Sequence, residues 1–198
     1  MLGASGASRS PFFALPSRQR LTLVGNGRVA SVLLECAPHG RAMDLYDTKS
    51  RIAEAFVESI FRRARYDVEP FRADPAGLRI GREDFSPNFT VCVAKGGPRF
   101  LVEVKYRTSV EQFLGLENQR RDSSIFLLAR RQWPALYFLL VTDHPEPGRS
   151  CFQSLASSRS GAITAVDLVS LEELKIFSHN VEDHERLLLR LVDLLSQI

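Results

Sequence analysis

Apolar and polar residues alternate most clearly from Phe100 to Arg107, and this alternation predicts a β-strand. Successive side chains of a strand point to opposite faces, so the apolar and aromatic residues at even positions should face a core. Glu103 and Lys105 would then project together from the other face. The pattern therefore predicts a carboxylate and an ammonium group side by side on a rigid backbone. A solvated charge pair on the wet face of a strand is the alternative.

A helical pattern precedes this strand. Apolar residues recur at intervals of three and four between Ile52 and Ala64, and Asp47 can cap the start of such a helix. Glu54 lies on this helix between two alanines, whose small side chains let another element approach closely. A surface charge without any further role is an equally acceptable interpretation of Glu54.

The rest of the pattern predicts further strands and helices. The expected strands are 66–71, 89–93, 135–141, 151–155 and 162–168, and the expected helices are 110–131, a short one through 172–173, and 182–198. Gly96-Gly97-Pro98 should turn the strand 89–93 back into Phe100–Arg107 as an antiparallel hairpin. Thr108 or Ser109 should cap the helix near Val110, which breaks around 119–124, and Ser170 should cap the short helix.

The domain organisation follows from these elements. Residues 1–20 have no acidic residue and are predicted to form a disordered tail. Residues 21–45 are predicted to form a β-hairpin around Gly25-Asn26-Gly27, with a linker after it. Residues 46–198 should form a single domain, whose core spans about 47–142.

Composition and charge narrow the class of protein. With 44% hydrophobic and 25% charged residues and no apolar run of membrane-spanning length, the sequence predicts a soluble protein without a membrane partner. Residues 1–131 contain 21 Lys and Arg against 14 Asp and Glu, an excess expected of a protein that contacts phosphates. Three widely spaced cysteines without a Cys-x-x-Cys motif favour reduced thiols and a cytoplasmic location.

The order of elements from 47 to 142 is helix, strand, strand, strand, helix, strand. Together with Ser86-Pro87-Asn88-Phe89 and Glu103-Val104-Lys105, this order resembles the PD-(D/E)XK nuclease superfamily, which includes many restriction endonucleases and archaeal Holliday-junction resolvases. The resemblance implies an α/β fold with a restriction-endonuclease-like αβββαβ core. Its mixed central sheet would be flanked by helices, and the N-terminal β-hairpin and C-terminal helices would be additions.

The resemblance also implies a metal-dependent site. Glu103 and the carbonyl of Val104 would be ligands of Mg²⁺ or Mn²⁺, which prefer oxygen. Lys105 would orient or help to deprotonate the attacking water and would offset charge in the transition state. Glu54 would contribute directly or through water.

The sequence departs from the superfamily pattern at Asn88, which stands where the motif has Asp. An amide oxygen can bind a metal but brings no charge, so hydrolysis would be weakened or lost. Asp84, and less favourably Glu83, could supply the missing carboxylate. Asn88 could also be an ordinary turn residue after Pro87.

Several polar residues after the central strand are candidates for binding DNA. Those that could reach a phosphate or a base are Arg107, Gln112, Gln119, Arg120 and Arg121, although ordinary solvated side chains would give the same pattern. The function predicted from the sequence is metal-dependent hydrolysis of DNA phosphodiester bonds. The alternatives are a non-catalytic nucleic-acid-binding module and a protein-interaction module, both on a degenerate nuclease fold, and a homodimer is one assembly compatible with either.

Overall fold

The computed structural model describes residues 44–72, 78–80, 83–93, 97–158 and 160–197. All of them belong to one unit, which spans Ala42–Ile198. The tail predicted for 1–20, the part of the predicted hairpin and linker (21–45) up to residue 43, and the turn predicted at 74–77 lie outside the described residues.

A six-stranded mixed sheet forms the centre of this unit. Its strands, in spatial order, are β1 (Tyr66–Pro70), β4 (Phe89–Val93), β5 (Arg99–Tyr106), β6 (Leu136–Val141), β7 (Phe152–Ser157) and β8 (Ile163–Asp167). Strands β5 and β6 are parallel, and every other neighbouring pair is antiparallel. The predicted α/β class with a mixed sheet is confirmed, as is the hairpin of β4 and β5.

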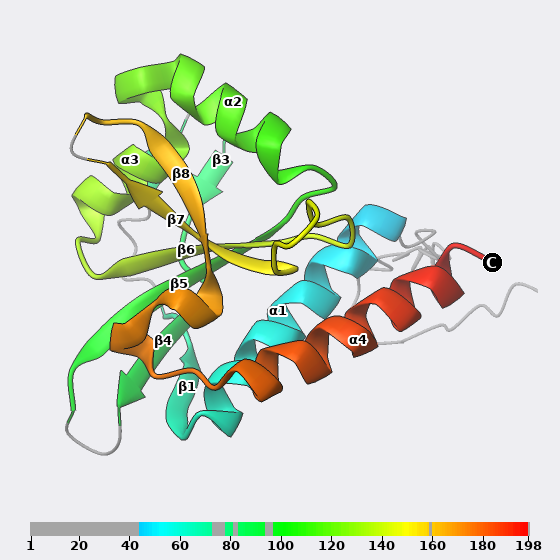
Figure 1. Ribbon diagram of the computed structural model, residues 1–198. Helices are drawn as coiled ribbons and strands as arrows, with labels where there is room; N and C mark the ends of the chain where they lie inside the picture. Colours follow the sequence, from blue (N-terminus) through cyan, green and yellow to red (C-terminus); the bar gives the residue numbers. More distant parts are fainter. Residues whose placement is uncertain (1–43, 73–77, 81–82, 94–96, 159, 198) are drawn as a thin grey trace, which may run out of the picture. The chain divides into compact units, whose positions relative to one another are not determined.

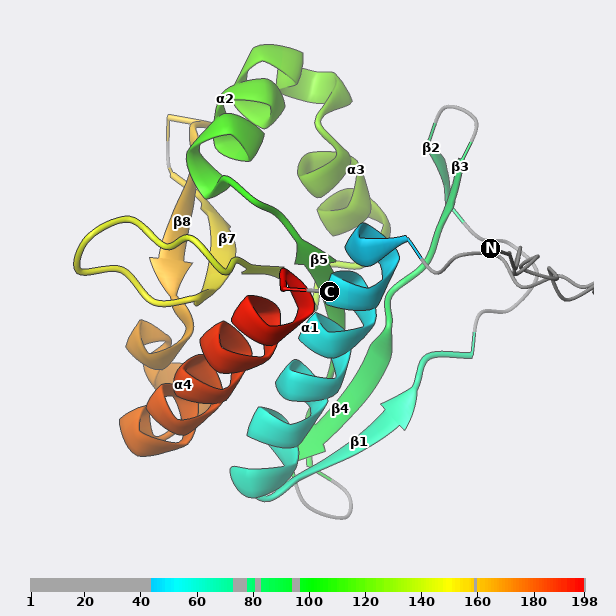
Figure 2. The ribbon, with the colours of Figure 1, turned by 90° about the vertical axis from the view of Figure 1, so that its right-hand side faces the viewer.

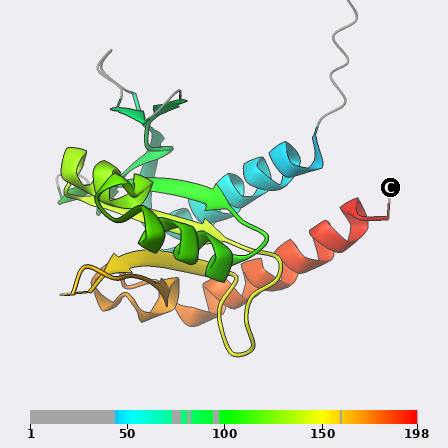
Figure 3. The same cartoon turned by 90° about the horizontal axis from the view of Figure 1, so that it is seen from above.

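Helices cover both faces of the sheet. Helices α1 (Leu45–Arg63) and α4 (Ser178–Leu195) pack side by side on one face, as Figures 1, 2 and 3 show, while α2 (Val110–Arg120) and α3 (Ile125–Gln132) lie on the other (Figure 1). Two hydrophobic clusters follow from this arrangement. One joins α1 and α4 to the face of β5 that carries Val102, and the other joins α2 and α3 to Phe138 of β6.

A second, two-stranded sheet was not expected from the sequence. Strands β2 (Leu78–Ile80) and β3 (Glu83–Phe85) pair antiparallel and project from the larger sheet (Figure 2). They are inserted between β1 and β4, so these first two strands of the large sheet are neighbours in space although β2 and β3 separate them in the sequence.

Several predicted helix ends are wrong. Helix α1 is capped by Asp44, whose carboxylate accepts the N–H of Tyr46, so Asp47 lies inside the first turn. Helix α4 begins at Ser178 rather than Glu182 and ends at Leu195. The short helix Glu172–Leu174 has no side-chain cap, because Ser170 belongs to the preceding 3₁₀ turn.

The predictions around α2 hold. Ser109 caps α2 by accepting the N–H of Gln112, and a 3₁₀ turn at Arg121–Ser123 makes the expected break before α3. Strand β6 is buried on both faces, as its apolar run predicts. Of the helices that the structure describes, none combines the length and apolarity needed to span a bilayer.

Candidate functional site

Strand β5 positions the central pair of the site. Its even-numbered residues from Phe100 to Tyr106 are buried, which confirms the predicted core face. Glu103 and Lys105 project from the opposite face, where Lys105 Nζ lies 2.6 Å from Glu103 Oε1. Because β5 is an interior strand of the sheet, both side chains project from backbone that hydrogen bonds hold in place.

The two members of the pair differ in exposure. The Glu103 side chain is 1% exposed, whereas that of Lys105 is 37% exposed. Glu103 is therefore not a solvated surface charge. A buried carboxylate with a half-buried ammonium group at its side forms a polar site that opens toward solvent through Lys105.

Burial raises the pKa of the Glu103 carboxyl to about 7, although the charge and the hydrogen bond of Lys105 act in the opposite direction. Glu54 raises this pKa further, and Arg107 lowers it. Glu103 Oε2 is buried and has no hydrogen-bond partner among the described residues. Since buried polar atoms in proteins are nearly always paired, this oxygen is suited to a ligand.

Asn88 lies beside this pair and is part of the sheet's hydrogen bonding. Its side-chain Oδ1 accepts the N–H of Val104 at 2.7 Å. Its backbone N–H donates to the carbonyl of Val102 at 2.9 Å, and its own carbonyl accepts the N–H of Phe71 at 2.9 Å. Asn88 thus continues the β4–β5 ladder beyond the start of β4 and fixes the backbone between Glu103 and Lys105.

These hydrogen bonds determine which oxygen atoms of Asn88 and Val104 could still bind a metal ion. One lone pair of Asn88 Oδ1 is used by Val104, so one remains for another partner. The N–H and carbonyl of a strand residue point to the same side, so the Val104 carbonyl is directed toward Asn88. The roles of Asn88 and Val104 as metal ligands remain predictions.

The other predicted acids come from two separate elements. Glu54 is a half-buried residue of α1, close enough to Glu103 to influence its ionisation. Asp84 lies on β3, where its backbone is in register with Arg79, and its side chain is outside the described part of the chain. No group of three or more His, Cys, Asp or Glu side chains suited to holding a metal occurs among the residues described.

An aromatic residue that the sequence did not indicate completes the wall of the site. Lys105 Nζ lies 5.5 Å from the centre of the Phe85 ring, close enough for a cation–π interaction. Phe85 stacks on Phe138 at 6.1 Å and contacts Trp133 at 5.9 Å. Its position at the end of an unpredicted short strand explains why the sequence did not reveal it.

Among the predicted DNA-binding residues, Arg107 influences the ionisation of Glu103 but forms its hydrogen bonds with other groups. Arg107 donates to Tyr46 Oη at 2.6 Å and to the Tyr106 carbonyl at 2.7 Å. Arg120 pairs with the buried Glu117 at 2.9 Å. The remaining three are exposed residues in α2 or at its C-terminal end: Gln112, Gln119 and Arg121. Within the described residues no hydrogen bond or ion pair joins any of the five to Glu103 or Lys105.

A second polar network lies at the ends of β5 and β6. The Asp143 carboxylate accepts hydrogen bonds from Lys49 at 2.7 Å and from Tyr106 Oη at 2.6 Å, and it pairs with His144 at 2.9 Å. Burial alone would raise the pKa of Asp143, but these three hydrogen bonds outweigh it and lower the pKa to about 2. The network fastens α1 to the sheet. In the sequence, this network is indicated by Thr142 and Asp143, two polar residues that directly follow the apolar run of β6.

Comparisons with known proteins give no further guide to this site. No family model, no curated protein and no solved structure matches the chain.

Proposed function

We propose that this protein hydrolyses DNA phosphodiester bonds with the help of a divalent cation, Mg²⁺ or Mn²⁺, on a restriction-endonuclease-like core. The order α1, β1, β4, β5, α2, β6 supports the proposal, since this is the order of the superfamily core. The sheet order β1-β4-β5-β6, with β5 parallel to β6, is compatible with it.

A single observation carries the proposal. Glu103 is buried on a central strand, gives one carboxylate oxygen to Lys105 and leaves the other without a partner among the described residues. Magnesium prefers carboxylate oxygen, and one or two carboxylates are enough when water and substrate phosphate complete its coordination. Glu103 Oε2 fits such an ion as one ligand, and the Val104 carbonyl and Glu54 would be nearby oxygens.

A bound cation would act as a Lewis acid on the scissile phosphate and would lower the pKa of the attacking water. The chain's own residues have complementary tasks. Lys105 would hold the attacking water and offset the negative charge that develops on the phosphate oxygens. Glu103 holds Lys105 in place at 2.6 Å, and Phe85 limits the volume in which its ammonium group can move.

A second candidate is a non-catalytic module that binds nucleic acid. It is favoured by Asn88, whose amide brings no charge and whose oxygen already accepts a backbone N–H. It predicts that DNA is retained in the presence of a chelator and released steeply as salt increases.

Plasmid cleavage distinguishes the two candidates. With Mg²⁺ or Mn²⁺ we expect nicking by the natural protein and a loss of about 100-fold in Lys105→Ala, since one charge-stabilising group is removed. Arg190→Ala is the matched control, because it removes an exposed cation of α4 on the opposite face of the sheet. Equal nicking by the natural protein and Lys105→Ala would exclude the proposed site.

Asn88→Asp extends the same assay. An aspartate can still accept the Val104 N–H and would add the missing charge. If Asn88→Asp cleaves and the natural protein does not, the natural protein is a degenerate nuclease; similar cleavage by both proteins would mean that another acid already serves.

A further inference from the structure

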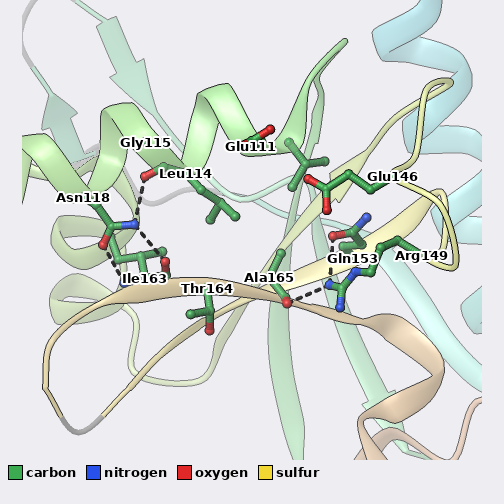
Figure 4. Close-up of a pocket in the computed structure, with 11 residues that line it drawn as sticks. Glu111, Leu114, Gly115, Asn118, Glu146, Arg149, Gln153, Ile163, Thr164 and Ala165 are labelled. Carbon is green, nitrogen blue, oxygen red and sulfur yellow. Dashed lines mark hydrogen bonds between the residues drawn. The ribbon is translucent and has the colours of Figure 1, made fainter.

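A cavity separate from Glu103 and Lys105 lies between α2 and the outer edge of β8. Its volume is about 460 Å³, within the range typical of small-molecule sites. Leu114 points from α2 into this space, toward the strand that carries Ala165 (Figure 4). Val110 and Ile163 add further apolar wall.

Side chains fix both ends of the cavity. At one end the Asn118 amide donates to the carbonyl of Ile163 and accepts its N–H, each at 2.8 Å, as a neighbouring strand would. At the other end Arg149 donates to the carbonyl of Ala165 at 2.8 Å (Figure 4). The edge of β8 is thereby held to α2 and to the loop before β7, so the cavity needs no rearrangement to exist.

The charges around the cavity are unbalanced. Arg149 is already engaged, because it also donates to Gln153 at 3.1 Å and lies 3.4 Å from Asp167. Glu111 and Glu146 line the same end of the cavity, and both are exposed. Their carboxylates form no hydrogen bond or ion pair with the residues that the structure describes, so the unpaired charge in the cavity is negative.

We propose that this cavity binds a small organic cation, an ammonium or guanidinium group carried on an aliphatic stem. The stem would pack between Leu114 and Ala165 and remove part of its apolar surface from water. The head group would lie between the carboxylates of Glu111 and Glu146, where an anion would be repelled. Neither the packing of the stem nor the position of the head group involves the proposed nuclease site, so each proposal can be tested without the other.

Titration of the full chain with pentylammonium chloride, followed by the NMR methyl signals of Leu114 and Ile163, tests this proposal. We expect saturable shifts that weaken as salt increases, because both carboxylates are exposed to solvent. Pentanol has a similar stem without a charge and should shift the same methyl groups less and without saturation.

Two double variants complete the experiment. Glu111→Gln with Glu146→Gln should weaken pentylammonium binding about tenfold, the effect of losing two exposed charge pairs. Glu172→Gln with Glu182→Gln removes two exposed acids elsewhere and should bind as the natural protein does. Equal binding of pentylammonium by the first double variant and the natural protein, equal binding of pentanol and pentylammonium, or the absence of saturable shifts would each overturn the proposal.

Discussion

Asp143 joins helix α1 to the ends of β5 and β6 through a single carboxylate. Its side chain is 1% exposed, and that of its ion-pair partner Lys49 is 12% exposed. A buried carboxylate that accepts several hydrogen bonds is stabilised in its charged form, which is the physical reason for its lowered pKa. The attachment of the first turns of α1 to the sheet is therefore strengthened by the ionised form of one residue.

The pH dependence of stability tests this role of Asp143. A carboxyl whose pKa is about 2 when folded and about 4 when unfolded stabilises the fold above pH 4. That contribution, about 2 kcal/mol, is lost as the pH falls from about 4 to about 2. The free energy of unfolding of the natural protein should thus approach that of Asp143→Asn over this interval in urea titrations. A difference that stays constant down to pH 2 would contradict the assignment.

At Glu103, the sequence predicted the direction of the side chain but not its environment. Alternation placed Glu103 and Lys105 on one face of a strand, and the structure confirms this. The burial of Glu103 was not predictable, because β5 lies inside a sheet whose neighbouring strand β6, with Phe138 as the register partner of Glu103, is remote in the sequence. The hydrogen bond from Val104 to Asn88 was equally hidden, since it spans two strands.

At the scale of the element, Glu117 connects α2 to α3. It is fully buried, and its carboxylate accepts Ser124 Oγ at 2.7 Å and the N–H of Phe126 at 3.2 Å, besides its pair with Arg120. One acid of α2 therefore satisfies donors at the start of α3. The two helices should keep their mutual orientation only while this carboxylate is present.

Replacement of Glu117 tests that connection. Glu117→Ala leaves buried donors unpaired and should lower the free energy of unfolding by about 3 kcal/mol. Glu117→Gln keeps one oxygen acceptor and should lower it by about 1 kcal/mol. Glu111→Ala removes an exposed acid of the same helix and should leave the free energy of unfolding, measured by chemical denaturation, nearly unchanged. If Glu117→Ala is as stable as Glu111→Ala, the carboxylate does not connect the helices.

Elements with a strong apolar period were predictable, and those without one were not. Strands β2 and β3 have three residues each, too few to establish an alternation. The first turn of α1 was missed because Leu45 and Tyr46 are each 43% exposed and lie outside the buried stripe. Helix α4 begins after Phe177, which offers no capping side chain, so its start gave no signal.

At the scale of the whole molecule, the sheet separates two faces of different chemical character. Helices α1 and α4 fill one face with the larger hydrophobic cluster, and Glu103 and Lys105 project on the other beside Phe85. Part of the basic excess in 1–131 that suggested DNA is engaged within the protein, since Arg62, Arg107 and Arg120 each bond to carbonyls or acids. Net charge alone would thus overstate the surface available to phosphate.

The open oxygen of Glu103 is central to the proposed function, and binding of Mn²⁺ to the full chain tests it most directly. Free Mn²⁺, measured by electron paramagnetic resonance during titration, should show binding to the natural protein and to Glu182→Gln, an exposed acid on α4. Glu103→Gln should bind at least about tenfold more weakly, because a ligand carboxylate is lost. Equal affinity of Glu103→Gln and the natural protein would contradict the account.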